Sequence, residues 1–422
     1  MLPYVNANKG PSMTQYTPSR RHLLGAAASG IAAAPFLYGP ATARNIAASA
    51  PPKAEGQPMP RGVRLPASPP PAPKGQSIGL AIVGLGGYAL NQIMPRIAEA
   101  DHCHLAAVVS GNAEKAATVA AAYGLPEDAI YSYDSYEEIA GDDRIDAVYV
   151  ILPTGLHTEF VLKAFTAGKH VICEKPMALT SAECEDMIAA GKAADRKLMI
   201  GYRCHFEPYN LKAMELMREE ALGPLRVIRT AHHYRSGPST PATNWRHNRA
   251  LAGGGPLEDY GLYGIQAGLY LSGEMPVRIS ASTQQPANDP RFAEIFAHTA
   301  SQMIFPSGAT SQHSTSYDGA GANMVTVRGQ TGFLTMEPAT GYGGHEMMLR
   351  KGRSTETLTP GNPSIQFAAM LDHFGLSVME GTEILTPGEM GLRDTRLIEA
   401  IYRSAETGRT MALNPDATMT EG

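Results

Sequence analysis

The sequence predicts an α/β protein: an N-terminal doubly wound parallel sheet, followed by a C-terminal α+β domain with a largely antiparallel, open-faced sheet. Two observations lead to this prediction. Apolar strands alternate regularly with helical segments over 76–201, and a strand-dominated pattern replaces that alternation over 202–422. The 422 residues are also enough for two domains with cores of their own.

The overall composition is that of an ordinary globular protein. The chain carries 35 basic and 40 acidic residues, a net charge of −5, and its pI is about 6.2. This balance argues against nucleic acid or an anionic membrane surface as the main partner. The four cysteines contain no C-x-x-C pair, so we expect neither a disulfide scaffold nor a metal site.

Residues 1–50 have the features of an export signal. No Asp or Glu precedes Glu55, and the paired Arg20-Arg21 stand before a weakly apolar run over 25–38 and small-residue cleavage sites. That run is too short and too rich in small residues for a stable membrane span. We therefore expect a cleaved twin-arginine signal, a periplasmic location and no membrane anchor in the mature form. The alternative is a chance arginine pair before an Ala-rich helix.

The next segment, 51–75, is rich in proline. Nine of its 25 residues are Pro, which favours an extended, polyproline-like chain over a packed element. Such a segment is either a spacer or an arm that lies over another surface.

A glycine-rich turn opens the parallel sheet. The apolar run Ile78–Val83 leads into Gly84-Leu85-Gly86-Gly87-Tyr88-Ala89, and helical character follows over 91–100 despite Pro95. In a G-x-G-x-x-A turn between strand and helix, the first glycine allows the tight turn and the second lets the backbone approach a pyrophosphate. The small third residue permits close packing, so this is a Rossmann-type dinucleotide fingerprint.

Further strands and helices supply the context that this motif needs. We expect strands at 105–109, 145–152, 171–173 and 198–200, with helices at 158–167 and 181–194 between them. Thr180 and Glu183 have the spacing of a capping box at the start of the last helix, and Gly168 ends the one before it.

The end of the second strand indicates the cofactor. An NAD site usually has an acid here for the ribose 2′-hydroxyl, whereas this chain has Ser110-Gly-Asn-Ala-Glu-Lys115. A hydroxyl and an ammonium suit a 2′-phosphate, so Ser110 and Lys115 favour NADP. The alternative is that both only cap and solvate a helix start.

A lysine follows the strand expected at 171–173, in Cys173-Glu174-Lys175-Pro176. Ligands of open α/β sheets bind at the carboxyl ends of the strands, where an ammonium can hydrogen-bond a sugar hydroxyl and lower the pKa of a neighbouring acid or base. Position alone leaves open a solvated surface lysine.

The second half is expected to contain strands at 225–232, 277–283, 301–305 and 324–336. The helical stretches are at 210–221, 256–271, 364–380 and 389–407. An apolar open sheet face would need cover, which predicts a homodimer or homotetramer. The histidines of this half show no spacing typical of metal ligands.

Several motifs together resemble one enzyme family. Gly84-Leu-Gly86, Leu152-Pro153 with His157, Glu174-Lys175-Pro176 and Asp259-Tyr-Gly-Leu-Tyr263 are similar to the glucose-fructose oxidoreductase/inositol dehydrogenase (Gfo/Idh/MocA) family. Within it the likeness is greatest to the glucose-fructose oxidoreductase branch, and it extends over nearly the whole chain.

The resemblance implies roles for individual residues. Lys175 matches the family's catalytic lysine, and Asp259 matches the acid that opens the family's Asp259–Tyr263 motif. Tyr263 matches the proton-transferring residue, and Lys175 would favour its phenolate form. The cofactor site implied by the turn and by the family comprises Gly84, Gly86, Gly87, Tyr88, Ala89, Ser110, Lys115, Leu152, Pro153, His157, Glu174, Lys175, Arg203, Trp245, Arg246 and Tyr342. Trp245, the single tryptophan, could equally be a core residue.

The expected function is that of an exported sugar oxidoreductase with tightly bound NADP. It would oxidise an aldose to its lactone and reduce a second sugar to an alditol in a ping-pong cycle, with the Pro-rich arm as a clamp over the nucleotide of its own or a partner subunit. Two alternatives are a glycosidase that uses transient oxidation and a sugar-binding relative without activity.

Overall fold

The computed structural model describes residues 56–71 and 75–420. The expected export signal, 1–50, lies outside the described residues, as do 51–55 and 72–74 of the Pro-rich arm.

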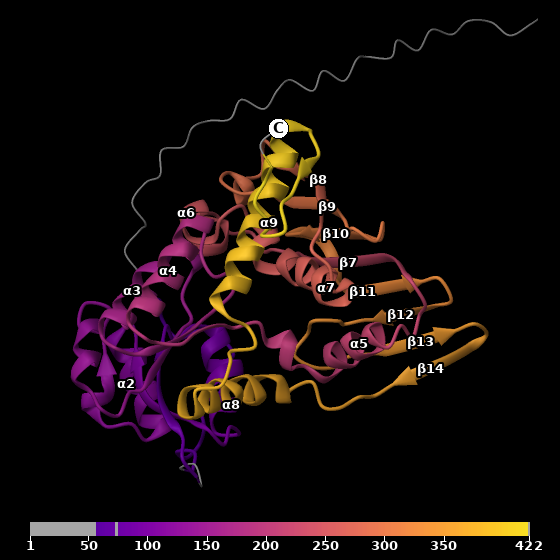
Figure 1. Cartoon of the computed structure of the whole chain (residues 1–422). Helices are drawn as coiled ribbons and strands as arrows, with labels where there is room; N and C mark the ends of the chain where they lie inside the picture. The colour runs from indigo at the N-terminus through magenta and orange to yellow at the C-terminus, as the bar shows by residue number, and fades with distance from the viewer. Residues whose placement is uncertain (1–55, 72–74, 421–422) are drawn as a thin grey trace, which may run out of the picture. The chain divides into compact units, whose positions relative to one another are not determined.

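The first sheet has six parallel strands in the order β3-β2-β1-β4-β5-β6. Its strands are β1 (Ile78–Val83), β2 (Cys103–Val109), β3 (Ile130–Tyr131), β4 (Ala147–Val150), β5 (His170–Cys173) and β6 (Leu198–Ile200). The order reverses between β1 and β4, which creates a crevice at the carboxyl ends of these two strands. The predicted doubly wound sheet is confirmed (Figure 1).

Both faces of this sheet are buried, because every residue of β1 is buried and alternate side chains enter two separate cores. On one face lie α1 (Met94–Ile97), α2 (Ala113–Tyr123) and α8 (Ile365–Glu380). On the other lie α3 (His157–Thr166), α4 (Ser181–Ala193) and α9 (Gly388–Thr407). The last two long helices of the chain thus complete cores that the N-terminal half begins (Figure 1).

Local signals explain several helix ends. The capping box predicted at Thr180 and Glu183 is present, and Gly168 follows α3 with a φ of +72°. The helical character expected over 91–100 is confirmed as far as Ile97, where a π-helical turn, Ala89–Ile93, leads into the short α1. Pro95 is the second residue of α1, directly after this turn.

The second sheet has nine strands in the order β14-β13-β12-β11-β7-β10-β9-β8-β15, and only the β7–β10 pair is parallel. Its strands are β7 (Leu225–Arg235), β8 (Arg278–Gln284), β9 (His298–Ile304), β10 (Thr310–Ser316), β11 (Asp318–Gly329), β12 (Gly332–Met336), β13 (Met347–Lys351), β14 (Ser354–Leu358) and β15 (Met411–Ala412). The predicted strand over 324–336 is two strands, since the chain reverses between Gly329 and Gly332.

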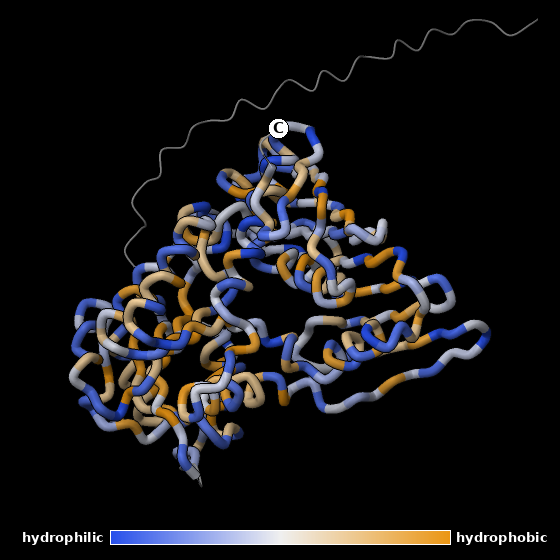
Figure 2. Tube along the Cα trace, viewed as in Figure 1, coloured by the Kyte–Doolittle hydropathy of each residue, from blue (hydrophilic) through white to orange (hydrophobic). Residues whose placement is uncertain are grey.

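One face of the second sheet carries α5 (Pro208–Arg218) and α7 (Leu262–Ser272), and the short α6 (Arg249–Ala252) precedes α7 in the chain. The opposite face was expected to be apolar, and it is mixed instead, because Arg229 and His233 share it with Val227 and Ala231 along β7. Arg229 donates to Gln312 across β7 and β10 at 3.1 Å, and His233 bonds Ser314 at 2.9 Å. In Figure 2 the strands of the second sheet mix all three colours, whereas those of the first sheet are mainly orange.

Glycines bring α7 against the second sheet. A Cβ added to Gly264 would overlap the Thr230 side chain of β7, and one added to Gly268 would lie 2.7 Å from Met303 of β9. The helix backbone therefore rests directly on the strands, and this contact sets the position of the turn that precedes α7, Leu257–Gly261.

We predict that Gly264→Ala destabilises the protein by about 1–3 kcal/mol, because the added methyl group must displace α7 from β7. Thermal unfolding checks this. Gly141→Ala is the control, since nothing lies within 4 Å of a Cβ built there. Equal unfolding temperatures for the two variants would contradict the prediction.

Candidate active site

The glycine-rich turn forms one wall of a cavity of about 980 Å³ at the carboxyl ends of the first sheet. Gly84 has a φ of +97°, and a Cβ there would overlap the Ile151 carbonyl. No atom lies within 4 Å of a Cβ built on Gly86, so its backbone faces open space. Gly87 and Tyr88 also line the cavity, whereas Ala89 is fully buried behind them.

The end of β2 contributes Lys115 but not Ser110. Ser110 is 3% exposed, does not line the cavity, and accepts a hydrogen bond from the Asn112 amide. Lys115 lines the cavity although its side chain is largely buried, and burial lowers its pKa. Within the described part of the chain no carboxylate lies within 4 Å of its ammonium. This cation therefore faces the space where a phosphate would satisfy it.

The described part of the Pro-rich arm lies over the turn that follows β2 of the same chain. The Gly56 backbone lies against Gly111, with no room for a Cβ on either residue, and Gln57 lines the cavity. Beyond this crossing, Met59, Val63 and Leu65 pack against the core that contains α8. Gln57 is a site residue that the sequence did not reveal, because proline content alone does not indicate where an arm lies.

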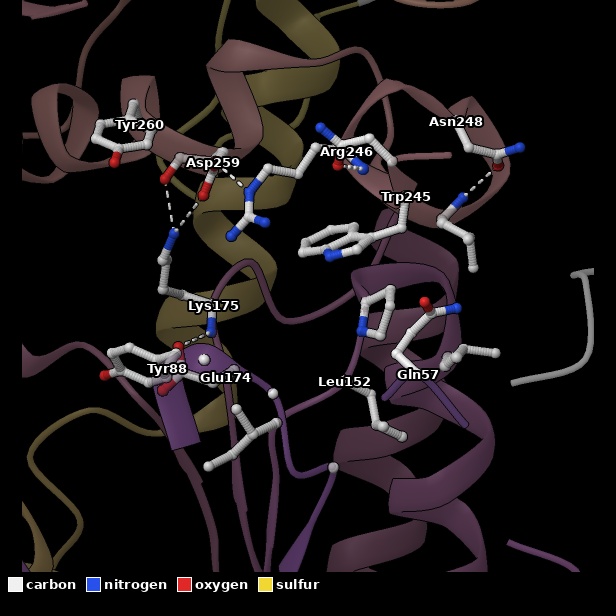
Figure 3. A pocket seen from close by; sticks show the side chains of 18 of the residues that line it. Gln57, Tyr88, Leu152, Glu174, Lys175, Trp245, Arg246, Asn248, Asp259 and Tyr260 are labelled. Atoms are coloured by element: carbon white, nitrogen blue, oxygen red, sulfur yellow. Dashed lines mark hydrogen bonds and ion pairs between the residues drawn. The ribbon is translucent and has the colours of Figure 1, made fainter. Parts of the chain in front are cut away.

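Lys175 forms the centre of the cavity's charge network. Its ammonium donates to the main-chain oxygen of Asp259 at 2.6 Å and lies 3.5 Å from the carboxylate atom Oδ1 (Figure 3). The other carboxylate oxygen, Oδ2, accepts from Arg246 Nε at 3.1 Å and from the Tyr317 hydroxyl at 2.8 Å. Burial favours the neutral form of Asp259, but Arg246 and Lys175 outweigh it and lower the pKa of this carboxyl.

Glu174 lies behind Lys175 and is 7% exposed. Its Oε1 accepts a 2.6 Å hydrogen bond from the Tyr149 hydroxyl, and its Oε2 accepts one from the Lys175 amide at 3.2 Å. Burial raises the pKa of this carboxyl in spite of those donors. Glu174 thus supports the Lys175 backbone from inside the sheet.

Tyr263 lies between two cations. The Lys175 ammonium is 4.9 Å from its ring centroid, and the Arg203 guanidinium carbon is 4.8 Å from it. Arg203 is held by the carbonyl of Thr340 at 2.6 Å and by Gln366 at 2.6 Å. Tyr342 lies beside the same guanidinium, 4.7 Å from ring centroid to guanidinium carbon.

Lys175 was expected to favour the phenolate of Tyr263, and its ammonium does face the ring, but burial acts in the opposite direction. Burial raises the pKa of Tyr263, so the neutral phenol is its resting form. The cation that acts most strongly against burial is Arg203.

Trp245 and Arg246 lie on a 3-10 turn, Trp245–His247, which Asn244 caps. The Arg246 guanidinium carbon is 4.4 Å from the Trp245 ring centroid, and both residues line the cavity. Leu152 and Pro153 form the facing wall, and Figure 3 shows Leu152 and Gln57 on the side of the cavity opposite Asp259.

His157 does not line the cavity. It is 1% exposed, and its two ring nitrogens face the carbonyls of Leu152 at 2.8 Å and Pro176 at 3.0 Å. This side chain therefore joins the loops that follow β4 and β5, and it acts on the cavity only through them. The sequence pattern could not distinguish a cofactor-binding histidine from one that joins the two loops, because both roles require a histidine beside the site.

Glu258 is a second acid that the sequence did not assign. It is 7% exposed, and its carboxyl accepts from the Gly254 amide and the Tyr402 hydroxyl, both at 2.6 Å. Burial raises its pKa to about 7. The π turn Leu257–Gly261 thus directs one of two adjacent acids into the protein and the other, Asp259, into the cavity.

Comparison with known proteins identifies the family. Residues 78–202 match the oxidoreductase family with an NAD-binding Rossmann fold, and residues 210–335 match the GFO/IDH/MocA C-terminal domain. The chain therefore belongs to the Gfo/Idh/MocA family of oxidoreductases.

Two relatives cover most of this chain. The NADP(+) D-xylose 1-dehydrogenase of Haloarcula marismortui is 30% identical over 80% of this chain and 93% of its own. The crystal structure of aldose-aldose oxidoreductase from Caulobacter crescentus, complexed with glycerol, is 46% identical over 80% of this chain and all of that chain, with a TM-score of 0.77. A 3-ketoreductase from Actinomadura kijaniata in complex with NADP, 22% identical over 78% of this chain and 98% of its own with a TM-score of 0.69, shares the fold.

The described residues contain neither a candidate membrane span nor a candidate metal cluster. No helix in 56–71 and 75–420 has the length and hydropathy that a membrane crossing requires. Over the same ranges, no three His, Cys, Asp or Glu side chains are grouped so that they could hold a metal ion.

We predict that Glu258 makes folding stability depend on pH. Because its folded pKa is raised to about 7 from 4.5, the native state binds the proton more tightly, and this contribution is lost as the pH rises from about 4.5 through 7. Glu258→Gln should remove this slope, about 3 kcal/mol in all. Its amide can accept from Gly254 and donate to the Tyr402 oxygen.

Urea unfolding of both proteins between pH 4 and 8 measures the difference. Parallel stability curves for wild type and Glu258→Gln would show that the carboxyl titrates normally.

Proposed function

We propose that this protein is an NADP-dependent oxidoreductase of sugars. The observation that carries the proposal is that Lys175, Asp259 and Tyr263 line the same cavity as the glycine-rich turn and the Lys115 ammonium. The relatives that cover four fifths of the chain, a xylose dehydrogenase and an aldose-aldose oxidoreductase, support sugars as the substrate class.

The residues present fit NADP. The open space at Gly86 suits a pyrophosphate, and the buried Lys115 ammonium suits a 2′-phosphate. Trp245, Leu152 and Pro153 offer apolar walls for the rings. When bound, the nicotinamide supplies the acceptor and donor of hydride.

The proton of the sugar hydroxyl moves through Tyr263. In the reductive direction the neutral phenol donates its proton to the carbonyl oxygen of the sugar. In the oxidative direction the phenolate accepts the hydroxyl proton, and the positive charges of Lys175 and Arg203, each within 5 Å of the ring, stabilise that anion. Asp259 holds the Lys175 ammonium at the cavity wall through its carbonyl and carboxylate.

More specifically, we propose a ping-pong cycle in which two sugars react in turn with a nucleotide that stays bound. One aldose is oxidised to its lactone, and a second sugar is then reduced to an alditol in the same site. The arm supports this, because Gly56 lies against Gly111 in the turn after β2 and Gln57 lines the cavity, so an arm in this position would hinder release of a bound nucleotide. The Arg20-Arg21 signal supports export to the periplasm, since the twin-arginine route carries folded, loaded proteins. A homodimer or homotetramer is the proposed assembly.

The test is to denature the purified protein, identify the released nucleotide, and then follow bound-NADPH fluorescence as single sugars are added. We expect NADP, an increase with an oxidisable aldose, and a decrease with the second sugar. Loss of nucleotide on gel filtration would overturn the two-sugar cycle, and the absence of any response to aldoses or ketoses would overturn the sugar assignment.

We predict that Tyr263→Phe lowers kcat by about 10²–10⁴-fold with little change in KM, because the ring remains while the proton donor is lost. Steady-state kinetics measure this. Tyr270→Phe is the matched control, since it removes a hydroxyl from the same helix, where it bonds Asn210 at 2.6 Å. Equal kcat values for Tyr263→Phe and wild type would exclude the role of this hydroxyl.

We predict that Lys115→Met weakens NADP binding roughly 10- to 100-fold and leaves NAD binding nearly unchanged, because only NADP has the 2′-phosphate. Calorimetric titration of nucleotide-free protein measures both affinities. Lys192→Met, whose lysine is exposed and paired with Glu389, is the control. A parallel loss for both nucleotides would place Lys115 elsewhere than at the 2′-phosphate.

A further inference from the structure

Tyr317 is a buried residue that touches the charge network without lining the cavity. It lies between β10 and β11, is 0% exposed, and donates its hydroxyl to Asp259 Oδ2 at 2.8 Å. Its position is fixed on both sides by the backbone, because its amide donates to Ala297 at 2.9 Å and its carbonyl accepts from Ser236 at 2.8 Å.

The Tyr317 ring is held as firmly as its backbone. The Tyr234 ring lies 4.9 Å away and the His247 ring 6.2 Å away, centroid to centroid. Phe292 and Ile295 complete the apolar cluster around it, and both are 0% exposed. The hydroxyl is therefore directed at Asp259 before any ligand enters the cavity.

The two oxygens of the Asp259 carboxylate have different partners. Oδ2 receives Tyr317 and Arg246, whereas Oδ1 faces the Lys175 ammonium at 3.5 Å. Because Oδ2 is held by two donors, the rotation of the carboxylate is set, and so is the place of Oδ1. Loss of the Tyr317 hydroxyl would leave one donor, Arg246, to hold Oδ2.

We propose that Tyr317 is a positioning residue that fixes the charge and rotation of Asp259 and, through it, the placement of Lys175 and Arg246. The role in turnover rests on the proposed function. The role in the charge network does not, since it follows from contacts among this chain's own residues.

The groups that face Asp259 set the sign of the expected pH effect. Lys175 and Arg246 are cationic, while Tyr234, Tyr260 and Tyr317 are phenols. Burial favours the neutral acid, but the two cations and the Tyr317 hydrogen bond lower its pKa. Removing the hydroxyl should therefore raise the pKa of Asp259 by about one unit, which is a tenfold change.

The single tryptophan offers a readout that needs neither sugar nor turnover. Trp245 lies 4.4 Å from the Arg246 guanidinium, whose Nε bonds Asp259, so protonation of Asp259 alters the surroundings of the indole. We would titrate Trp245 fluorescence in the purified full chain over the acidic range in which the far-UV circular dichroism stays constant. The proteins compared are wild type, Tyr317→Phe and Tyr136→Phe.

Tyr136→Phe is the matched control because it removes an equally buried hydroxyl, one that bonds the Phe160 carbonyl at 3.1 Å. We expect the fluorescence transition to move about one pH unit upward in Tyr317→Phe alone. We also expect kcat to fall about tenfold with little change in KM, and the acid limb of the pH–kcat profile to move upward with it.

Two results would overturn the proposal: the same transition in all three proteins, or equal changes in Tyr317→Phe and Tyr136→Phe, which would mark a general loss of packing. These results differ from a failure of the proposed function. In that case the wild-type protein would turn over no sugar, but the fluorescence shift in Tyr317→Phe would persist.

Discussion

The contact between Lys175 and Asp259 is the interaction on which the site depends. The ammonium follows β5 of the first sheet, and the carboxylate comes from the turn before α7, which rests on the second sheet. Buried charges are costly unless they are paired and hydrogen-bonded. Here each charge has more than one partner, because Lys175 also donates to a carbonyl and Asp259 also accepts from Arg246. The cavity therefore acquires its chemistry only when both sheets are in place.

The adjacent acids Glu258 and Asp259 show how a turn can separate two similar side chains. At Glu258 burial outweighs two neutral donors and the Arg249 cation and raises the pKa, whereas Asp259 faces two cations and has a lowered pKa. An α-helical turn places neighbouring residues 100° apart, and the π turn changes that relation at this point. Below neutral pH the pair carries one negative charge beside Lys175 instead of two.

The sequence predicted the first sheet well because its signals are local. Apolar runs mark β1, β4 and β5, and glycines mark the turns, so the doubly wound class and the nucleotide edge follow from spacing. The two-residue strand β3 was not predicted, because it is too short to form an apolar run. The polar strand β10 escaped notice, since Thr310–Ser316 is buried against α7 through small hydroxyl groups and has no apolar alternation.

The candidate site was predictable only in part. Lys175, Asp259 and Tyr263 carried recognisable motifs, and the structure brings them together. Gln57, Glu258 and Tyr317 reach the site or its support through packing between segments far apart in the chain, which no local pattern records. The increase that burial causes in the pKa of Tyr263 was likewise not predicted. Motifs indicate which charged residues lie near a side chain, but they do not indicate how deeply that side chain is buried.

The crossing of Gly56 over Gly111 links two parts of the sequence that would otherwise vary independently. Neither backbone has space for a side chain at the crossing, and no enlargement of one residue can be offset by the other, because glycine has nothing left to remove. Gly111 also meets the Tyr133 ring, so three segments share one steric requirement. The arm and the turn after β2 are therefore sterically coupled: a larger residue at either position would require the two segments to move apart.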